Sequence, residues 1–210
     1  MTDRDVLIVV DVKNDFCPGG ALAVPEGDRV VPVINGIIRR FSRVVATQDW
    51  HPHNHVSFAS AHPGKKPYEQ IDRGGAIQVL WPDHCVAGTE GAALHPGLAA
   101  DRLSLVVRKG ISPSLDSYSA FLENDRATRT GLDGYLRSVG AGRVFICGLA
   151  TDYCVFYSAM DSAAFGFETA VLIDACRGID VPENNIRLSI TAMKGKGIRI
   201  LNASDIGGDG

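Results

Sequence analysis

The sequence predicts an α/β fold, a three-layer α/β/α arrangement around a mostly parallel sheet of six strands. Short runs rich in Val and Ile alternate with helical patterns along the chain, which is typical of βαβ units with right-handed crossovers. The first run, residues 6–10, is apolar at every position, as expected for a strand covered on both faces. The length of 210 residues suits one domain, and we expect a single domain over residues 1–210.

The remaining elements follow from the same alternation. The expected strands are rich in apolar residues and lie at residues 6–10, 44–47, 103–107, 144–147, 169–173 and 198–201. The expected helices show apolar residues at i, i+3 and i+4 and lie at residues 28–41 and, approximately, 128–139, 152–164 and 182–193. Asp28 is expected to cap the first helix, and Pro32 falls near its first turn, where a missing N–H costs little.

Residues 50–102 interrupt this alternation. They show little periodicity and contain all six histidines and five of the ten prolines. An irregular stretch of this length in a compact domain is usually functional or disordered, and the concentration of histidines favours a functional loop region.

Composition and charge exclude several classes of protein. The net charge is −3 and the chain has no basic block, so a nucleic-acid partner is not expected. The apolar runs are far shorter than the roughly 20 residues that a membrane span needs, and the polar first residues do not resemble a signal peptide. Five cysteines without tight pairing favour a reducing compartment and hence a cytoplasmic enzyme. The sequence leaves the oligomeric state open between a monomer and a small homo-oligomer.

Reactive side chains follow four of the expected strands. Asp11 follows the first strand, Asp49 and His51 the second, Lys109 the third, and the fourth leads through a short turn to Cys154. In open α/β sheets, ligands bind beyond the carboxyl ends of the strands. We therefore expect these side chains to meet at one edge of the sheet and to form a catalytic site.

Cys154 is the candidate nucleophile. It lies where a helix is expected to begin, so free N–H groups and the helix dipole favour its thiolate, and a nearby ammonium from Lys109 would act in the same direction. A thiolate attacks amide carbonyls, and Asp11, partly removed from water, is suited to exchanging a proton with it. The alternative for any lone cysteine is a small buried hydrophobe, which is what we expect of the other thiols Cys85, Cys147 and Cys176.

The histidine-rich region offers a metal site. An Asp-x-His pair on an extended segment points both side chains to the same side, so Asp49 and His51 can share an ion such as zinc, iron or manganese. His84 and His55 both remain candidates for a third ligand, since spacing does not decide between them. Two further histidines are expected to be polar surface residues, His53 and His62.

Five segments, in order, resemble the motifs of the nicotinamidase (pyrazinamidase) family of isochorismatase-like hydrolases. They are residues 10–17 (VDVKNDFC), 47–52 (TQDWHP), 81–86 (WPDHCV), 109–110 (KG) and 148–155 (GLATDYCV). The resemblance runs through most of the chain and implies a Rossmann-like, isochorismatase-type fold with a long metal-binding loop insertion.

By this resemblance, Cys154 is the nucleophile, Asp11 the general acid and base, and Lys109 the third member of a catalytic triad. The N–H groups of Ala150 and Cys154 would form an oxyanion hole, with a non-proline cis peptide before Ala150. One divalent ion, zinc foremost with iron or manganese as alternatives, would be held by three ligands, Asp49, His51 and His84. The residues implied to line the ring pocket are Phe16, Leu22, Trp81 and Tyr118.

The implied reaction is hydrolysis of nicotinamide, and of pyrazinamide, to the acid and ammonia through a cysteine thioester, with the metal orienting the pyridine nitrogen. It would belong to pyridine nucleotide (NAD) salvage. One departure is Lys13, where relatives commonly have Gln, and we expect it to change the charge near the pocket mouth. Two alternatives remain, a related cysteine amidohydrolase acting on a carbamoyl or maleamate-like substrate, and a non-catalytic thiol- or metal-binding module.

Overall fold

The computed structural model describes residues 1–75 and 77–206, and its centre is a six-stranded sheet. The strands run in the order β5-β2-β1-β6-β7-β8, and every neighbouring pair is parallel. Their bounds are β1 Asp5–Val10, β2 Arg43–Asp49, β5 Leu105–Lys109, β6 Arg143–Leu149, β7 Glu168–Arg177 and β8 Arg199–Leu201. The six expected strands are all present, and the parallel sheet is confirmed.

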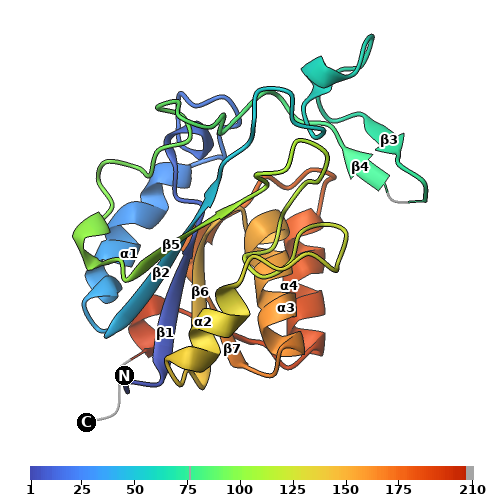
Figure 1. Cartoon of the computed structure of the whole chain (residues 1–210). Helices are drawn as coiled ribbons and strands as arrows, with labels where there is room; N and C mark the ends of the chain where they lie inside the picture. The colour runs from blue at the N-terminus through green and yellow to red at the C-terminus, as the bar shows by residue number, and fades with distance from the viewer. Residues whose placement is uncertain (76, 207–210) are drawn as a thin grey trace.

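Helices cover both faces of this sheet (Figure 1). One face carries α1 (Val30–Ile38), and the other carries α2 (Leu132–Ser138), α3 (Phe156–Ala164) and α4 (Asn185–Gly195). The apolar stripe of α1 is buried, and β1 is buried along its whole length. The three-layer α/β/α architecture is therefore confirmed.

The helices begin later than their sequence patterns suggest. Asp28 does not cap α1, because a 3₁₀ turn (Gly27–Arg29) precedes the helix and no side chain caps it. A single π-helical turn (Thr151–Val155) precedes α3. Ahead of α4, the buried Asp152 carboxylate accepts the N–H groups of the 179–180 loop at 3.0 and 2.9 Å, so that loop is held in a non-helical path.

Strands β2, β5, β6 and β7 extend beyond their apolar runs, and the extensions of β2 and β5 matter for the site. β2 ends at Asp49 and β5 at Lys109, and these two residues are register partners in the parallel ladder. The sequence pattern stopped short because it follows apolar side chains, whereas the ladder depends on the backbone. The extension places both charged side chains on the sheet itself rather than on the loops that follow it.

The histidine-rich region is more ordered than its sequence suggests. It contains a small antiparallel hairpin, β3 (Gln70–Asp72) with β4 (Ile77–Val79), which projects from the body of the molecule (Figure 1). Isolated bridges, His51 with Val86 and Phe58 with Trp81, join its other parts. Strands of three residues are too short to show a period, which is why the hairpin was not predicted. In the part of the chain that the structure describes, no helix is long and apolar enough to cross a membrane.

Gly148 is expected to be essential to this sheet. Its φ is +116°, and a Cβ there would lie 2.1 Å from the carbonyl oxygen of Val10 on β1. The substitution Gly148→Ala should therefore lower the free energy of unfolding by about 3 kcal/mol or more, measured by urea denaturation. Gly134→Ala on the exposed face of α2, where a Cβ meets no atom within 4 Å, is the control and should be neutral or slightly stabilising. Equal stability of the two variants would contradict this account.

Asp5 is expected to stabilise the opposite end of β1. Its buried carboxylate pairs with Arg143 through two contacts of 2.6 Å and accepts the N–H of Thr2 at 2.6 Å. Burial alone would raise the pKa of Asp5, but these hydrogen bonds outweigh burial and lower it below the ordinary value of 3.8. The contribution of Asp5 to the free energy of unfolding is therefore present above about pH 3.8. It is lost as the pH falls through the lower pKa of the folded state. Asp5→Asn should cost about 2 kcal/mol at pH 7 in urea denaturation, and the loss should shrink at acid pH.

Candidate active site

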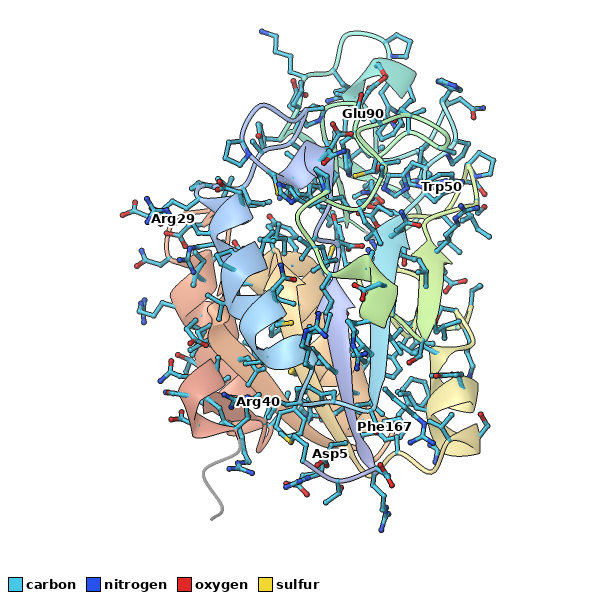
Figure 2. The ribbon with its side chains drawn as sticks, turned by 90° about the vertical axis from the view of Figure 1, so that its left-hand side faces the viewer. Asp5, Arg29, Arg40, Trp50, Glu90 and Phe167 are labelled. Carbon is cyan, nitrogen blue, oxygen red and sulfur yellow. The ribbon has the colours of Figure 1, made fainter. Side chains whose placement is uncertain are left out.

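A pocket lies beyond the carboxyl ends of the central strands. Figure 2 labels Trp50, which directly follows β2 at this end of the sheet, and Asp5 at the opposite end. The residues that line the pocket are Phe16, Leu22, Val24, Asp49, His51, Trp81, His84, Asp116, Ser117, Tyr118, Ala150, Tyr153, Cys154 and Ile179. The candidate metal ligands, the candidate nucleophile and all four expected pocket residues therefore meet in one cavity.

Asp11, Lys109 and Cys154 come together at the base of this pocket. The Lys109 ammonium is fully buried, lies 3.0 Å from Asp11 Oδ2 and donates to Cys154 Sγ at 3.5 Å. It also donates to the carbonyl oxygen of Ser117 at 3.0 Å and contacts the Asp49 carboxylate. Asp11 Oδ1 is occupied by the Thr47 hydroxyl at 2.8 Å and the Asp49 N–H at 3.2 Å, so Oδ2 is the oxygen left for Cys154.

Cys154 is more deeply buried than its position at a helix start suggests. Burial raises the pKa of the Cys154 thiol well above its usual value of 9.0, and the opposing effect of Lys109 does not offset it. The nearby carboxylates of Asp11 and Asp49 raise it further. The sequence shows the helix start and the lysine but not the depth of burial. A cysteine in this state needs a base to remove its proton before it can attack.

Asp49, His51 and His84 form a cluster beside this triad. One potential ligand atom from each lies within 4.8 Å of the others. His51 Nδ1 donates to the Gly110 carbonyl at 2.9 Å and His84 Nδ1 to the Pro82 carbonyl at 2.7 Å, so Nε2 is left as the ligand atom of each ring. Backbone carbonyls that hold the second nitrogen in this way are typical of metal-binding histidines.

The protonation states of these groups also suit a metal. Burial lowers the pKa of His51 well below 6.5 and also lowers that of His84, so both imidazoles are neutral ligands. Burial alone would raise the pKa of Asp49, but the positive charges around it, with Lys109 foremost, hold it well below its usual value. A carboxylate with two neutral imidazoles fits zinc, iron(II) or manganese.

His55 does not compete for this cluster. Its Nδ1 lies 2.7 Å from the Ser57 hydroxyl and its Nε2 donates to the Leu115 carbonyl at 3.1 Å, so both ring nitrogens are engaged. The ring stacks on His51 with centroids 4.1 Å apart and thereby supports the orientation of that ligand. The structure thus favours His84 over His55 as the third ligand.

Of the two histidines expected at the surface, His53 is exposed, whereas His62 is half-buried and donates to the Val56 carbonyl at 2.8 Å.

Aromatic side chains form one wall of the pocket. Trp81 donates through Nε1 to the Tyr118 hydroxyl at 3.2 Å, and the ring of Tyr153 packs edge-on against Trp81 with centroids 5.0 Å apart. Phe16 lies closer to the metal cluster, 5.6 Å from the His84 ring. This wall is suited to a flat ring of small size.

The turn after β6 carries the expected backbone feature. The Leu149–Ala150 peptide bond is cis, as the family resemblance implies, and Ala150 is followed directly by the turn Thr151–Val155, which contains Cys154. Three other cysteines, Cys85, Cys147 and Cys176, are buried outside the pocket lining, as expected.

Lys13 is placed differently from the expectation. It is fully buried rather than at the pocket mouth, and its Nζ donates to the main-chain carbonyl of Asp49 at 2.5 Å. The chain pairs with residues 93–95 on both sides of Lys13, which draws the lysine into the interior.

Two residues of the site, Asp116 and Thr47, were not predicted from the sequence. Asp116 is buried in the pocket lining and accepts a hydrogen bond from Gln78 at 2.7 Å, and Thr47 orients Asp11 from within β2. A carboxylate among polar loop residues looks like any surface turn, so only the fold brings Asp116 to the pocket. Position on a strand that ends at the site would have singled out Thr47.

Comparisons with known proteins agree with this geometry. Residues 5–205 match the model of the isochorismatase domain family. The chain is 48% identical over 200 residues to a nicotinamidase of Acinetobacter baylyi, covering 95% of this chain and 93% of that protein. It is 44% identical to a nicotinamidase of Escherichia coli over 95% of each chain.

Solved structures give the same result. A nicotinamidase/pyrazinamidase of Acinetobacter baumanii superposes with a TM-score of 0.96 at 45% identity, over 98% of this chain and 99% of that one. PnC1 of L. infantum, in complex with nicotinate, gives a TM-score of 0.85 at 40% identity, over 97% and 96% of the two chains. A pyrazinamidase of Pyrococcus horikoshii, in complex with zinc, gives 0.77 at 39% identity, over 95% and 99%. Taken with the pocket described above, these similarities establish that the chain belongs to the nicotinamidase/pyrazinamidase family of isochorismatase-like hydrolases.

Proposed function

We propose that this protein is a nicotinamidase that hydrolyses nicotinamide to nicotinate and ammonia and also accepts pyrazinamide. The observation that carries the proposal is the meeting of the Asp11–Lys109–Cys154 triad with the Asp49–His51–His84 cluster inside one aromatic-walled pocket. Relatives that are named nicotinamidases match nearly the whole chain.

Asp11 begins the reaction as a base. Its Oδ2 takes the proton of the Cys154 thiol, and the thiolate sulfur attacks the carboxamide carbon. Lys109, in contact with both groups, pairs with the Asp11 carboxylate before the transfer and stabilises the thiolate afterwards. The N–H groups of Ala150 and Cys154 would stabilise the oxyanion that develops on the amide oxygen.

The same carboxyl group completes the cycle. Protonated Asp11 donates to the amide nitrogen, the C–N bond breaks, and ammonia leaves a thioester on Cys154. Asp11 then accepts a proton from water, which attacks the thioester carbon and releases nicotinate. The proton returns from Asp11 to the thiolate and restores the resting thiol.

Asp49, His51 and His84 would hold one divalent ion. When bound, this ion supplies a Lewis-acidic position for the pyridine nitrogen and so orients the carboxamide toward Cys154. The zinc complex of the Pyrococcus horikoshii relative supports zinc as the ion. Phe16, Leu22, Trp81 and Tyr118 would pack against the ring.

The pocket disfavours the alternative substrates. A maleamate-like substrate carries a carboxylate, yet the described lining residues include no Lys or Arg, and two of them are aspartates. An uncharged aromatic carboxamide fits a lining of aromatic and aliphatic side chains without an unpaired charge.

The proposal is tested by measuring ammonia release by the zinc-loaded protein from nicotinamide, pyrazinamide and maleamate. We expect turnover of the two aromatic amides and at least about a hundredfold lower kcat/KM for maleamate. Preferred turnover of maleamate would overturn the substrate assignment. Absence of turnover of all three by the zinc-loaded protein would overturn the proposed chemistry.

Removal of the metal gives a further prediction. Dialysis against a chelator should lower kcat/KM for nicotinamide by about a hundredfold or more, because the ring is no longer aligned with Cys154. Zinc should restore the activity, and the metal content should be followed by mass spectrometry. Full activity after complete removal of the metal would contradict the orienting role.

A further inference from the structure

Lys13 is a buried charged residue beside the site, and the proposed reaction does not use it. Its side chain is inaccessible to solvent, and its Nζ donates to the carbonyl oxygen of Asp49 at 2.5 Å and lies 5.4 Å from the centroid of the Phe16 ring. A buried ammonium is costly unless opposite charges or several acceptors surround it. The burial of the Lys13 ammonium next to Asp49, a proposed metal ligand, must therefore be compensated by nearby groups.

The charges at the base of the pocket explain why a buried ammonium is favourable at this position. Two buried carboxylates, Asp11 and Asp49, share the single ammonium of Lys109. With Lys109 alone, this cluster would carry one net negative charge inside the protein. Lys13 supplies a second buried positive charge next to the main chain of Asp49 and offsets the excess negative charge of these two carboxylates.

The charge of Lys13 also acts on the metal ligands. Its Nζ donates to the main-chain carbonyl of one proposed ligand, Asp49, and the Asp49 carboxylate lies beside the other two proposed ligands, His51 and His84. A buried positive charge this close to the proposed ligands repels a divalent ion held by them. The same residue therefore favours the metal-free cluster and disfavours the metal-bound one.

We infer that Lys13 is a built-in countercharge that stabilises the metal-free active site and weakens the affinity of the site for a divalent cation. This inference rests on the proposed metal site at Asp49, His51 and His84. It assigns Lys13 a positioning and tuning role, since the residue does not line the pocket. An uncharged side chain of similar length at this position should bind the metal more tightly and depend on it more for stability.

The test uses Lys13→Gln and Lys13→Met, which both remove the charge, the first with a polar end and the second with an apolar one. The dissociation constant for Zn²⁺ is measured by competition with a chromophoric chelator, and thermal denaturation is recorded with and without Zn²⁺. Both variants should bind Zn²⁺ at least about tenfold more tightly than the unsubstituted protein. Their metal-free forms should melt about 5 °C lower or more, so that Zn²⁺ raises their Tm further than it raises that of the parent.

Lys196→Gln is the matched control, because it removes the same charge from an exposed position after α4. It should leave both the Zn²⁺ affinity and the metal-free Tm unchanged. A Lys13 variant that folds only in the presence of Zn²⁺ would also support the inference, because its metal-free form would be the less stable one.

Three outcomes would overturn the inference. One is a Zn²⁺ affinity that is unchanged or weaker in both variants. Another is failure to fold with and without Zn²⁺, which would make Lys13 a structural requirement that the metal does not replace. The third is absence of Zn²⁺ binding by the unsubstituted protein, and only this outcome would also remove the proposed metal site.

Discussion

Replacing Cys154 by alanine is expected to lower kcat for nicotinamide by about 10⁴-fold or more. The thiol is the sulfur nucleophile nearest to both Asp11 and Lys109, and the other described cysteines are buried outside the pocket lining. Ammonia release under saturating substrate measures the loss. Intact-protein mass spectrometry of acid-quenched reactions should show an acyl adduct on the parent protein and none on the variant.

Cys147→Ala is the control for this change, since Cys147 lies within β6 and its Sγ is directed to the Ile8 carbonyl. It removes a buried thiol from the same strand that leads to the site, and it should retain activity. Turnover by the Cys154 variant within tenfold of the parent would exclude a thioester mechanism and favour direct attack by water.

Replacing Asp11 by asparagine is expected to lower kcat by about a thousandfold. Burial raises the pKa of the Cys154 thiol, so the thiolate is scarce at neutral pH unless a base takes the proton. Asparagine retains an oxygen for the Thr47 hydroxyl and the Asp49 N–H but accepts no proton. Both the attack on the amide and the departure of ammonia should therefore slow.

The control lies at the other end of the same strand. Asp5→Asn makes the same chemical change at the amino end of β1, and it should lower stability without lowering kcat. Binding of nicotinate to the Asp11 variant, followed by calorimetry, should stay within a few fold of the parent. A large loss of binding together with a small loss of kcat would assign Asp11 to substrate recognition rather than to proton transfer.

Much of the site was predictable because the relevant residues follow strands that the apolar pattern defines. Asp11, Lys109 and Cys154 each lie at or just after the end of a predicted strand, and parallel strands bring their carboxyl ends to one edge. The Asp-x-His spacing placed Asp49 and His51 together for a similar local reason. Such inferences depend on short stretches of chain, which the sequence specifies directly.

Other features depended on contacts between distant segments. The choice of His84 over His55 follows from hydrogen bonds that engage both nitrogens of His55, one of them with Leu115. The arrival of Asp116 in the pocket lining and the β3–β4 hairpin likewise have no local pattern. Hydrophobic periodicity indicates which face of a helix or strand is buried. It does not indicate which loops come together at the end of the sheet.

The layered α/β fold, the edge of the sheet at which the candidate site lies, and the residue types available for its chemistry could all be inferred from local periodicity and strand order. The electrostatic environment of the site, in contrast, depends on the folded interior. The pKa of the Cys154 thiol is raised by burial, and Lys13 lies buried against the main chain of Asp49. Desolvation and charge pairing are properties of the assembled interior, and they have no counterpart in the order of residues along the chain.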